Sequence, residues 1–383
     1  MATPQGSGRI GANPIFAGAA MDPHARAVLK DIPAYVSGER FPVRAEGSAS
    51  LVYLASNENP LGPSPLALEA SAHASSKWAR YPDDDCAELR EALAARHGVS
   101  AAHVVVGAGS AALLKLLAEA YLDAGRTAVY AWPSFPMYPA TARLQEAVEV
   151  RVPLDGGGRH DLARMAEAAR GASLVMVCNP NNPTGTYVSE AELGAFLDRV
   201  PEDALVVLDE AYAEFARAAA PDYPDGVRWV RDGRRVAVLH SFSKVYGLAG
   251  LRVGYLVAPP EVVEAVVRVR EPFQVSSPAQ AAALAALGDQ NHVARTLQVV
   301  AEGRTRLHQL AERLHLRTYP SVANFVWLDV GRPADQVGRD LLRRGVVVRP
   351  GPPGATWIRV SVGTPVEVDR FETALRDVIP AGG

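Results

Sequence analysis

Residues 103–131, HVVVGAGSAALLKLLAEAYLDAGRTAVYA, carry the strongest fold signal in this chain. The stretch begins with an apolar, β-branched run at 103–106, which predicts a buried strand. A glycine-containing turn follows, and residues 110–122 then predict a helix that Ser110 could cap. A second apolar run at 127–131 predicts another strand. A strand, a helix and a strand in this order favour parallel strands joined by a helical crossover.

The same alternation continues to about residue 258. We expect further strands at 148–154, 173–178, 204–208, 236–240 and 251–258, and a helix at 189–199 capped by Ser189. Several runs are apolar at successive positions, which is typical of strands covered on both faces. The pattern predicts an α/β fold, in which a mostly parallel sheet is sandwiched by helices. Ligands of such sheets bind where strand ends meet helix starts.

The pattern changes after Pro259. We expect helices at 261–270 and 278–314, strands at 324–330, 346–349 and 358–362, and a last helix from Val366. This order predicts a smaller α+β domain at 261–383, after a large domain at 61–260. We interpret residues 22–60 as an arm that joins the small domain, and residues 1–21 as a mobile tail.

Composition excludes several classes of protein. The chain has 383 residues, 48% hydrophobic and 21% charged, which excludes a disordered chain. Its net charge of −3 does not favour a nucleic-acid partner. Cys86 and Cys178 are the only cysteines, so they cannot form a zinc cluster, and they fit a reducing cytoplasm. We expect no metal site. No apolar run approaches the roughly 18 residues of a membrane helix, so we expect a cytoplasmic protein without a membrane partner.

The turn at 107–112, GAGSAA, has the features of an anion site. Ala108, Gly109 and Ser110 lie at a helix start, whose backbone N–H groups and dipole suit a phosphate. The letters also match the loose dinucleotide fingerprint, but the next strand ends in AWP, at 131–133, without the acidic residue that a ribose needs. These residues disfavour a dinucleotide and leave open a phosphate site or a tight turn without a ligand.

Two further motifs follow buried strands. Residues 179–185, NPNNPTG, would present the Asn182 amide to a crevice at a strand end, and the alternative is a structural turn. Asp209, in the DEAY motif at 209–212, could pair with a buried cation. The alternative for Asp209 is a helix cap or a structural ion pair.

A lysine follows the next apolar run, within residues 241–252, SFSKVYGLAGLR. In a crevice, desolvation and nearby cations would lower the pKa of Lys244 and make its amine nucleophilic. Ser241, Ser243 and Arg252 could together bind a phosphate. The alternative is a solvated surface lysine.

Two arginines interrupt apolar strands near the C-terminus. Arg359 alternates with Ile358 and Val360, so its side chain lies on the opposite face. Arg349 lies in the preceding strand. Each faces solvent by default, whereas in a crevice Arg359 could clamp a carboxylate with two hydrogen bonds.

Together these motifs resemble pyridoxal-phosphate aminotransferases of the aspartate aminotransferase fold, and more narrowly the histidinol-phosphate aminotransferase family. Residues 55–60, ASNENP, 80–83, RYPD, and 246–252, YGLAGLR, are close to that family's signatures. The closest likeness is to its actinobacterial branch that acts on aromatic amino acids, through VSS at 275–277 and ANFVWL at 323–328.

The resemblance implies a role for each motif. Lys244 would hold pyridoxal phosphate covalently and later move the substrate Cα proton, and Asp209 would pair with the ring nitrogen. Asn182 and Tyr212 would hydrogen-bond the ring 3′ oxygen, and Phe135 would stack on the ring. The cofactor phosphate would be bound by Ala108, Gly109, Ser110, Ser241, Ser243 and Arg252.

The remaining roles concern the substrate and a second subunit. Arg359 would clamp the substrate α-carboxylate, and Tyr35 and Arg349 would face its distal end. Tyr81 would reach the phosphate of the neighbouring subunit, which implies a homodimer with shared active sites.

The resemblance implies an aminotransferase that moves an amino group between an aromatic or imidazolyl amine and 2-oxoglutarate. Many histidinol-phosphate enzymes carry acidic residues where this chain has AAL, at 111–113. This departure favours aromatic amino acids, with histidinol phosphate as the alternative. A nicotinamide dehydrogenase would explain the 107–112 loop alone, and a non-enzymatic regulator would need a DNA-binding segment that does not precede the fold. Lyase or decarboxylase chemistry with the same cofactor stays open.

Overall fold

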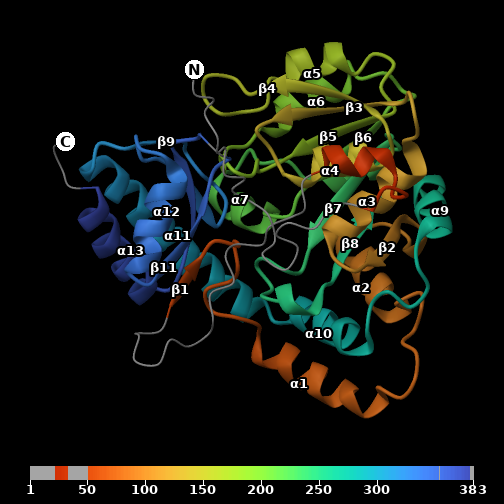
Figure 1. The fold of residues 1–383 in the computed structure, drawn as a ribbon. Helices are drawn as coiled ribbons and strands as arrows, with labels where there is room; N and C mark the ends of the chain where they lie inside the picture. The colour runs from red at the N-terminus through yellow and green to blue at the C-terminus, as the bar shows by residue number, and fades with distance from the viewer. Residues whose placement is uncertain (1–21, 33–50, 353, 380–383) are drawn as a thin grey trace.

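The computed structural model describes residues 22–32, 51–352 and 354–379, and these residues form two β-sheets (Figure 1). The larger sheet contains, in spatial order, β2 (Val104–Gly107), β8 (Gly254–Val257), β7 (Val236–Ser241), β6 (Leu205–Asp209), β5 (Leu174–Cys178), β3 (Thr127–Trp132) and β4 (Val148–Pro153). β8 is antiparallel to its two neighbours, and the other pairs are parallel. The predicted α/β class, with a mostly parallel sheet, is confirmed.

Helices cover both faces of the larger sheet. One face packs against α2 (Ala87–His97), α5 (Leu162–Ala168), α6 (Glu190–Leu197) and α8 (Gly226–Arg231), and the other against α3 (Ser110–Tyr121), α4 (Met137–Leu144) and α9 (Pro260–Val269). β5 shows why its sequence is apolar throughout. Val175 and Val177 lie in one core, while Leu174 and Met176 lie in the other, because successive side chains of a strand point to opposite faces.

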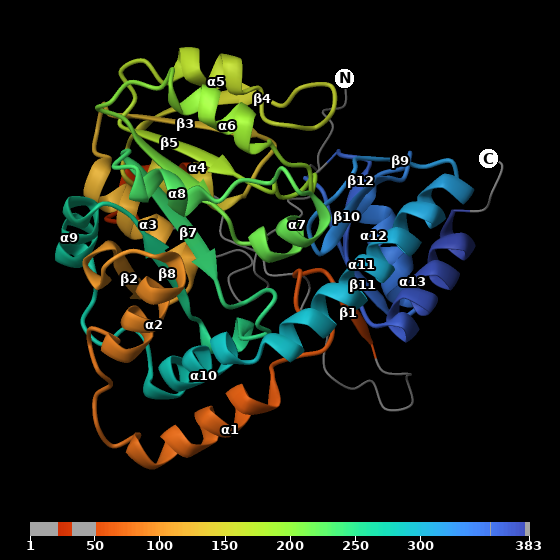
Figure 2. The same cartoon turned by 180° about the vertical axis from the view of Figure 1, so that it is seen from behind.

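The smaller sheet lies beside the larger one and faces α7 (Ala213–Ala219) (Figures 1 and 2). It contains, in order, β1 (Val52–Leu54), β11 (Val346–Pro350), β12 (Trp357–Ser361), β10 (Phe325–Asp329) and β9 (Arg317–Thr318). Its helices are α11 (Gln290–Arg313), α12 (Ala334–Arg343) and α13 (Pro365–Val378). β1 comes from the N-terminal part of the chain and pairs in parallel with β11.

Two helices lie below the larger sheet in Figure 1, α1 (Pro65–Ala74) and α10 (Ser277–Gly288), and they pack against each other. The predicted helix at 278–314 is wrong as one element. It ends with α10 and restarts as α11, because Asp289 accepts a hydrogen bond from the N–H of His292 and so caps a new helix.

Of three further local expectations, two are wrong and one is confirmed. Ser110 does not cap α3, because Gly109 with φ 94° occupies the cap position and Ser110 is already helical. The strand expected at 251–258 begins only at Gly254, because Arg252 adopts a left-handed φ of 54°. Ser189 does cap α6, in a reciprocal capping box with Glu192.

Some predictions fall outside the described residues, namely the tail at 1–21 and Tyr35. The domain boundaries at 60/61 and 260/261 stay predictions. Within the described ranges, no helix combines the length and the apolar character that crossing a bilayer would require.

Candidate active site

The carboxyl ends of three neighbouring parallel strands bring the predicted motifs to one edge of the larger sheet. β5 leads into the loop that carries Asn182, β6 ends at Asp209, and β7 ends at Ser241. The register places Cys178 opposite Asp209, and Asp209 opposite Leu239. Because parallel strands end at the same edge, side chains far apart in the sequence lie in one crevice.

Asp209 is a buried carboxyl group, with 5% of its surface exposed. Its Oδ2 accepts a hydrogen bond from the Tyr138 hydroxyl at 3.2 Å, and its Oδ1 accepts one from the Ala211 N–H at 3.3 Å. Burial raises the pKa of Asp209 to about 6, although both hydrogen bonds and the nearby Lys244 ammonium oppose the rise. A cation placed against this carboxylate would therefore be stabilised.

Lys244 follows β7 and points towards the arm and Tyr212. Its Nζ donates to the Ser56 carbonyl at 3.2 Å and lies 5.6 Å from the centre of the Tyr212 ring. Burial and then the Arg359 guanidinium lower the pKa of Lys244 to about 8, while Glu58 and Asp209 oppose this shift. Lys244 thus has a larger neutral, nucleophilic fraction near neutral pH than a surface lysine.

Arg359 reaches from the smaller sheet to a loop of the larger one. Its Nη1 donates to Asn182 Oδ1 at 2.6 Å, and its Nη2 donates to the Ala55 carbonyl at 2.6 Å. Its guanidinium carbon lies 5.4 Å from the centre of the Phe325 ring. Arg349 is its register partner across β11 and β12, so the two arginines are neighbours on one face of the sheet.

The loop between β2 and α3 lies against Arg252. A Cβ added at Gly109 would lie 2.5 Å from Arg252 Nη2, so this glycine leaves the space that the guanidinium needs. Arg252 Nη1 donates to Ser243 Oγ at 3.4 Å, and Ser241 Oγ accepts the N–H of Ser243 at 3.1 Å. The structure therefore brings together the predicted phosphate ligands, with Ala108 and Ser110 on either side of Gly109.

Phe135 and Tyr81 differ in their surroundings. Phe135 packs edge-on against Tyr138, with ring centres 5.7 Å apart, so it lies beside the residue that contacts Asp209. Tyr81 is 80% exposed and stacks on Phe273 at 4.6 Å. It also lines a surface hollow with Trp78.

Sequence reasoning missed residues that support the site. Tyr138 contacts Asp209, and Asn57 donates to Tyr212 OH at 2.9 Å. Ser361 and Asn324 in turn contact Asn57. Asn57 lies within the ASNENP signature, which could have marked it, whereas no local pattern marks Tyr138.

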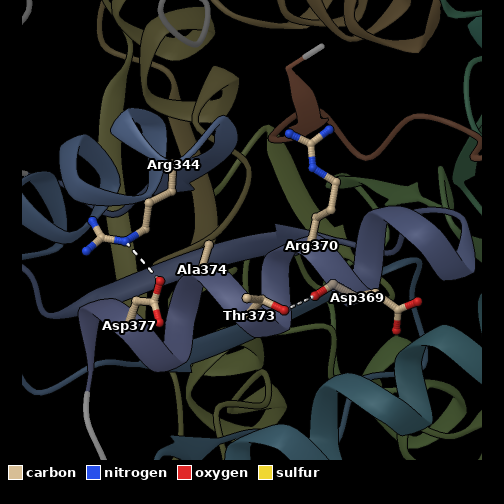
Figure 3. A pocket seen from close by; sticks show the side chains of 6 residues that line it. All are labelled: Arg344, Asp369, Arg370, Thr373, Ala374 and Asp377. Atoms are coloured by element: carbon tan, nitrogen blue, oxygen red, sulfur yellow. Dashed lines mark hydrogen bonds and ion pairs between the residues drawn. The ribbon is translucent and has the colours of Figure 1, made fainter. Parts of the chain in front are cut away.

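Surface hollows occur both at the predicted site and elsewhere on the described residues. One, of about 380 Å³, lies against the site and is lined by Glu58, Ser243 and Ser361 among others. Figure 3 shows another, of about 400 Å³, between Arg344 and α13. There Arg344 pairs with Asp377 at 3.6 Å, and none of the predicted site residues contributes to its lining.

Residues 49–375 match the family described as aminotransferase class I and II. The chain belongs to this family. It is 45% identical to a histidinol-phosphate aminotransferase of Moorella thermoacetica, over 93% of both chains. It is 43% identical to an aromatic amino acid aminotransferase of Thermobifida fusca, over 92% of this chain and 97% of the relative.

A solved relative has the same fold. The histidinol-phosphate aminotransferase of Sinorhizobium meliloti, solved in complex with pyridoxal-5'-phosphate, superposes with a TM-score of 0.79 at 32% identity, covering 86% of this chain and 90% of that one. The present protein, as a class I and II aminotransferase, is an enzyme that depends on pyridoxal phosphate.

The residues of the site fit this cofactor. Asp209 offers a buried carboxylate for a protonated ring nitrogen. Lys244 offers an amine whose pKa is lowered to about 8. The space at Gly109, which a Cβ would fill, leaves Arg252 and the start of α3 open to a phosphate.

Proposed function

We propose that this aminotransferase moves an amino group between an aromatic or imidazolyl amine donor and 2-oxoglutarate. One observation carries the proposal. Asp209 ends β6, Lys244 follows β7 and Arg359 lies in β12. Lys244 and Arg359 donate to the successive carbonyls of Ser56 and Ala55. This arrangement puts a nucleophilic amine, a carboxylate and a carboxylate-binding guanidinium within one crevice.

Each side chain then has a role that its environment supports. Pyridoxal phosphate, when bound, supplies an electron-withdrawing ring that acidifies the substrate Cα–H bond. Asp209 would keep a proton on the ring nitrogen through opposite charge. Lys244 would hold the cofactor and later move the Cα proton at its Nζ. The guanidinium of Arg359 would bind the substrate α-carboxylate with its parallel N–H groups.

The other ligands hold the cofactor in place. Asn182 uses its Oδ1 for Arg359, which leaves its amide N–H groups for the ring oxygen, together with Tyr212. Phe135 would stack on the ring. The loop Ala108–Ser110, Ser241, Ser243 and Arg252 would bind the phosphate.

The choice of donor rests on aromatic side chains and on Arg349. Phe325 lies under Arg359, and Trp327 is the register partner of Arg359 across β10 and β12. These rings suit an aromatic donor. Histidinol phosphate is the second candidate, because several similar relatives are histidinol-phosphate aminotransferases and Arg349 could bind a distal phosphate. Tyr35, which we also expect at the distal end, lies outside the described residues.

We further propose a homodimer that works in the cytoplasm. Trp78 is 71% exposed and Tyr81 is 80% exposed, and large exposed aromatic side chains are typical of interfaces. Both cysteine thiols are free and buried, which suits a reducing compartment.

A donor panel with 2-oxoglutarate tests the proposed substrates. It should contain phenylalanine, tyrosine, tryptophan and histidinol phosphate, and we expect the aromatic amino acids to give the higher kcat/KM. Much faster turnover of histidinol phosphate would establish the second candidate. Borohydride reduction followed by peptide mapping should label Lys244, and a label on another lysine would contradict its role.

A further inference from the structure

The main chain of residues 55–57, the site segment, accepts hydrogen bonds from side chains of the site. The successive carbonyls of Ala55, Ser56 and Asn57 accept hydrogen bonds from Arg359, Lys244 and Asn324, respectively. The last of these is 3.0 Å long and buried. The segment thus contacts Arg359 of the smaller sheet and Lys244, which follows β7 of the larger sheet. Its side chain at position 57 lies next to Tyr212.

Asn57 in this segment is buried and held by hydrogen bonds of both its main chain and its side chain. Its surface is 1% exposed, and its φ of 54° lies in the left-handed region that asparagine tolerates. Its N–H donates to Ser361 Oγ at 2.8 Å, and the Ser361 hydroxyl donates back to Asn57 Oδ1 at 3.1 Å. Ser361 lies in β12, two positions after Arg359.

These bonds fix which way the amide of Asn57 points. Ser361 Oγ already accepts the Asn57 N–H, so its own proton needs an acceptor, and Oδ1 provides one. The amide nitrogen must then face Tyr212, to whose hydroxyl oxygen it donates at 2.9 Å. Burial raises the pKa of Tyr212 above its usual range, so the phenol keeps its single proton at neutral pH. With its oxygen accepting from Asn57, that proton is directed to another acceptor.

We propose that Asn57 is a positioning residue that makes Tyr212 a hydrogen-bond donor to the ring oxygen of the bound cofactor, and that Ser361 ties this setting to the strand carrying Arg359. The inference rests on the proposed function, because it requires Tyr212 to face the cofactor. The motifs of the sequence analysis assign no role to Asn57. Its contribution acts through Tyr212, so the two residues should not behave independently.

The test measures the pH at which the absorption of the bound cofactor changes in the holoenzyme. A hydrogen bond donated to the ring oxygen favours its anionic form and lowers this midpoint. Tyr212→Phe should raise the midpoint by about one to two pH units, the size of one hydrogen bond to a charged group. Asn57→Gly keeps the left-handed backbone and should raise it by about half a unit, because Tyr212 loses polarisation and orientation.

The double variant separates the proposal from a general disturbance. In the Tyr212→Phe background, Asn57→Gly should shift the midpoint by less than about 0.2 unit. Asn59→Ala is the matched control. Asn59 lies two positions after Asn57 but donates to Val245 O at 2.7 Å and to Thr296, so its loss should leave the midpoint unchanged.

The outcomes distinguish this inference from the proposed function. If Tyr212→Phe leaves the midpoint unchanged, Tyr212 does not face the cofactor and the proposed placement is wrong. If Tyr212→Phe shifts it but Asn57→Gly does not, or if Asn57→Gly shifts it equally in both backgrounds, the inference alone is overturned.

A second variant covers the case in which Asn57→Gly loses the fold or the cofactor. Ser361→Ala removes the group that orients the amide, so it should raise the midpoint in the same direction, and this shift should vanish in the Tyr212→Phe background. An unchanged midpoint in Ser361→Ala would overturn the inference.

Discussion

The carboxyl group of Asp209 is held at both oxygens, by the Tyr138 hydroxyl and by the Ala211 N–H. Tyr138 is fully buried, and it also packs against Phe135. A single side chain thus contacts the residue expected at the ring nitrogen and the residue expected on the ring face. Substitution of Tyr138 therefore tests how its hydrogen bond affects the pKa of Asp209.

Tyr138→Phe should raise the pKa of Asp209 above its value of about 6, because the lost hydrogen bond favours the ionised form. A carboxyl group with a raised pKa in the folded state stabilises the fold at low pH, and this stability is lost as the pH rises through the folded pKa. In cofactor-free protein, the loss should end near pH 6 in the wild type and continue to higher pH in Tyr138→Phe. Thermal unfolding against pH measures it, with Asp209→Asn as the reference that lacks the effect.

Tyr130→Phe is the matched control for this experiment. Tyr130 is equally buried and lies 5.8 Å from Tyr138 between ring centres, but its hydroxyl donates to Glu149. A profile in Tyr130→Phe that moves as far as that of Tyr138→Phe would contradict the assignment to Asp209.

Arg349→Ala should harm the half-reaction with 2-oxoglutarate more than the half-reaction with phenylalanine. If Arg349 binds the second carboxylate of 2-oxoglutarate, as we propose, this substrate would gain a charge-assisted hydrogen bond that a neutral ring cannot use. The loss in kcat/KM should therefore differ by about tenfold to a hundredfold between the two half-reactions. Single-turnover kinetics with each substrate measures the gap, and equal losses would remove Arg349 from substrate recognition.

Among the elements, the loop at 179–185 does more than present Asn182. Gly185, with φ 74°, accepts the N–H of Val322 at its carbonyl, at 2.8 Å. A Cβ on Gly185 would lie 2.1 Å from Ser321 Oγ and 3.0 Å from the Ser321 Cα. The loop is therefore fastened to the segment that leads into β10, and the glycine is what allows the close approach.

Gly185→Ala should destabilise the fold by about 3 kcal/mol or more, because a left-handed backbone and a backbone clash act together. Gly171→Ala is the control. Gly171 has a similar φ of 75° with nothing within 4 Å of the added Cβ, so it should cost about 1–2 kcal/mol. Denaturant unfolding measures both free energies. Equal losses would show that the contact with Ser321 does not matter.

At the scale of the whole molecule, the exposed rings of Trp78 and Tyr81 line one surface hollow, to which neither Asp209 nor Lys244 contributes. Tyr81 and Phe273 stack at 4.6 Å, and Phe273 is 42% exposed. Arg270 and Asp84 form an ion pair at 2.8 Å that holds this region together. In the homodimer that we propose, the second copy would cover these rings, and Tyr81 would reach the other site.

Mixing inactive Lys244→Ala subunits with Tyr81→Phe subunits tests this arrangement. If Tyr81 serves the partner's site, each heterodimer contains one site with neither change. Random pairing should then restore roughly a quarter of wild-type activity, because half of the dimers have one intact site of two. Activity that never exceeds the sum of the two homodimers would show that the sites are not shared.

The sequence alone determined the class of fold and marked candidate site residues at the strand ends. Strands such as β5 are apolar at every position because both faces are covered, and this signal is local. Asp209 likewise ends such a strand, and Lys244 and Arg252 stand in a short motif that follows one. Expectations about element ends were less accurate, because Asp289 and the left-handed Arg252 interrupt patterns that look continuous.

Only the tertiary structure decided how these residues are supported. Asn57 lies 155 positions from Tyr212 and 304 positions from Ser361, yet it contacts both. Tyr138 meets Asp209 across 71 positions. No sequence pattern records such contacts, because periodicity reflects which side of an element is buried and not which distant partner covers it. The strand-end motifs contain the groups to which we assign the reaction, and the packing of the two sheets sets their hydrogen bonds and their charges.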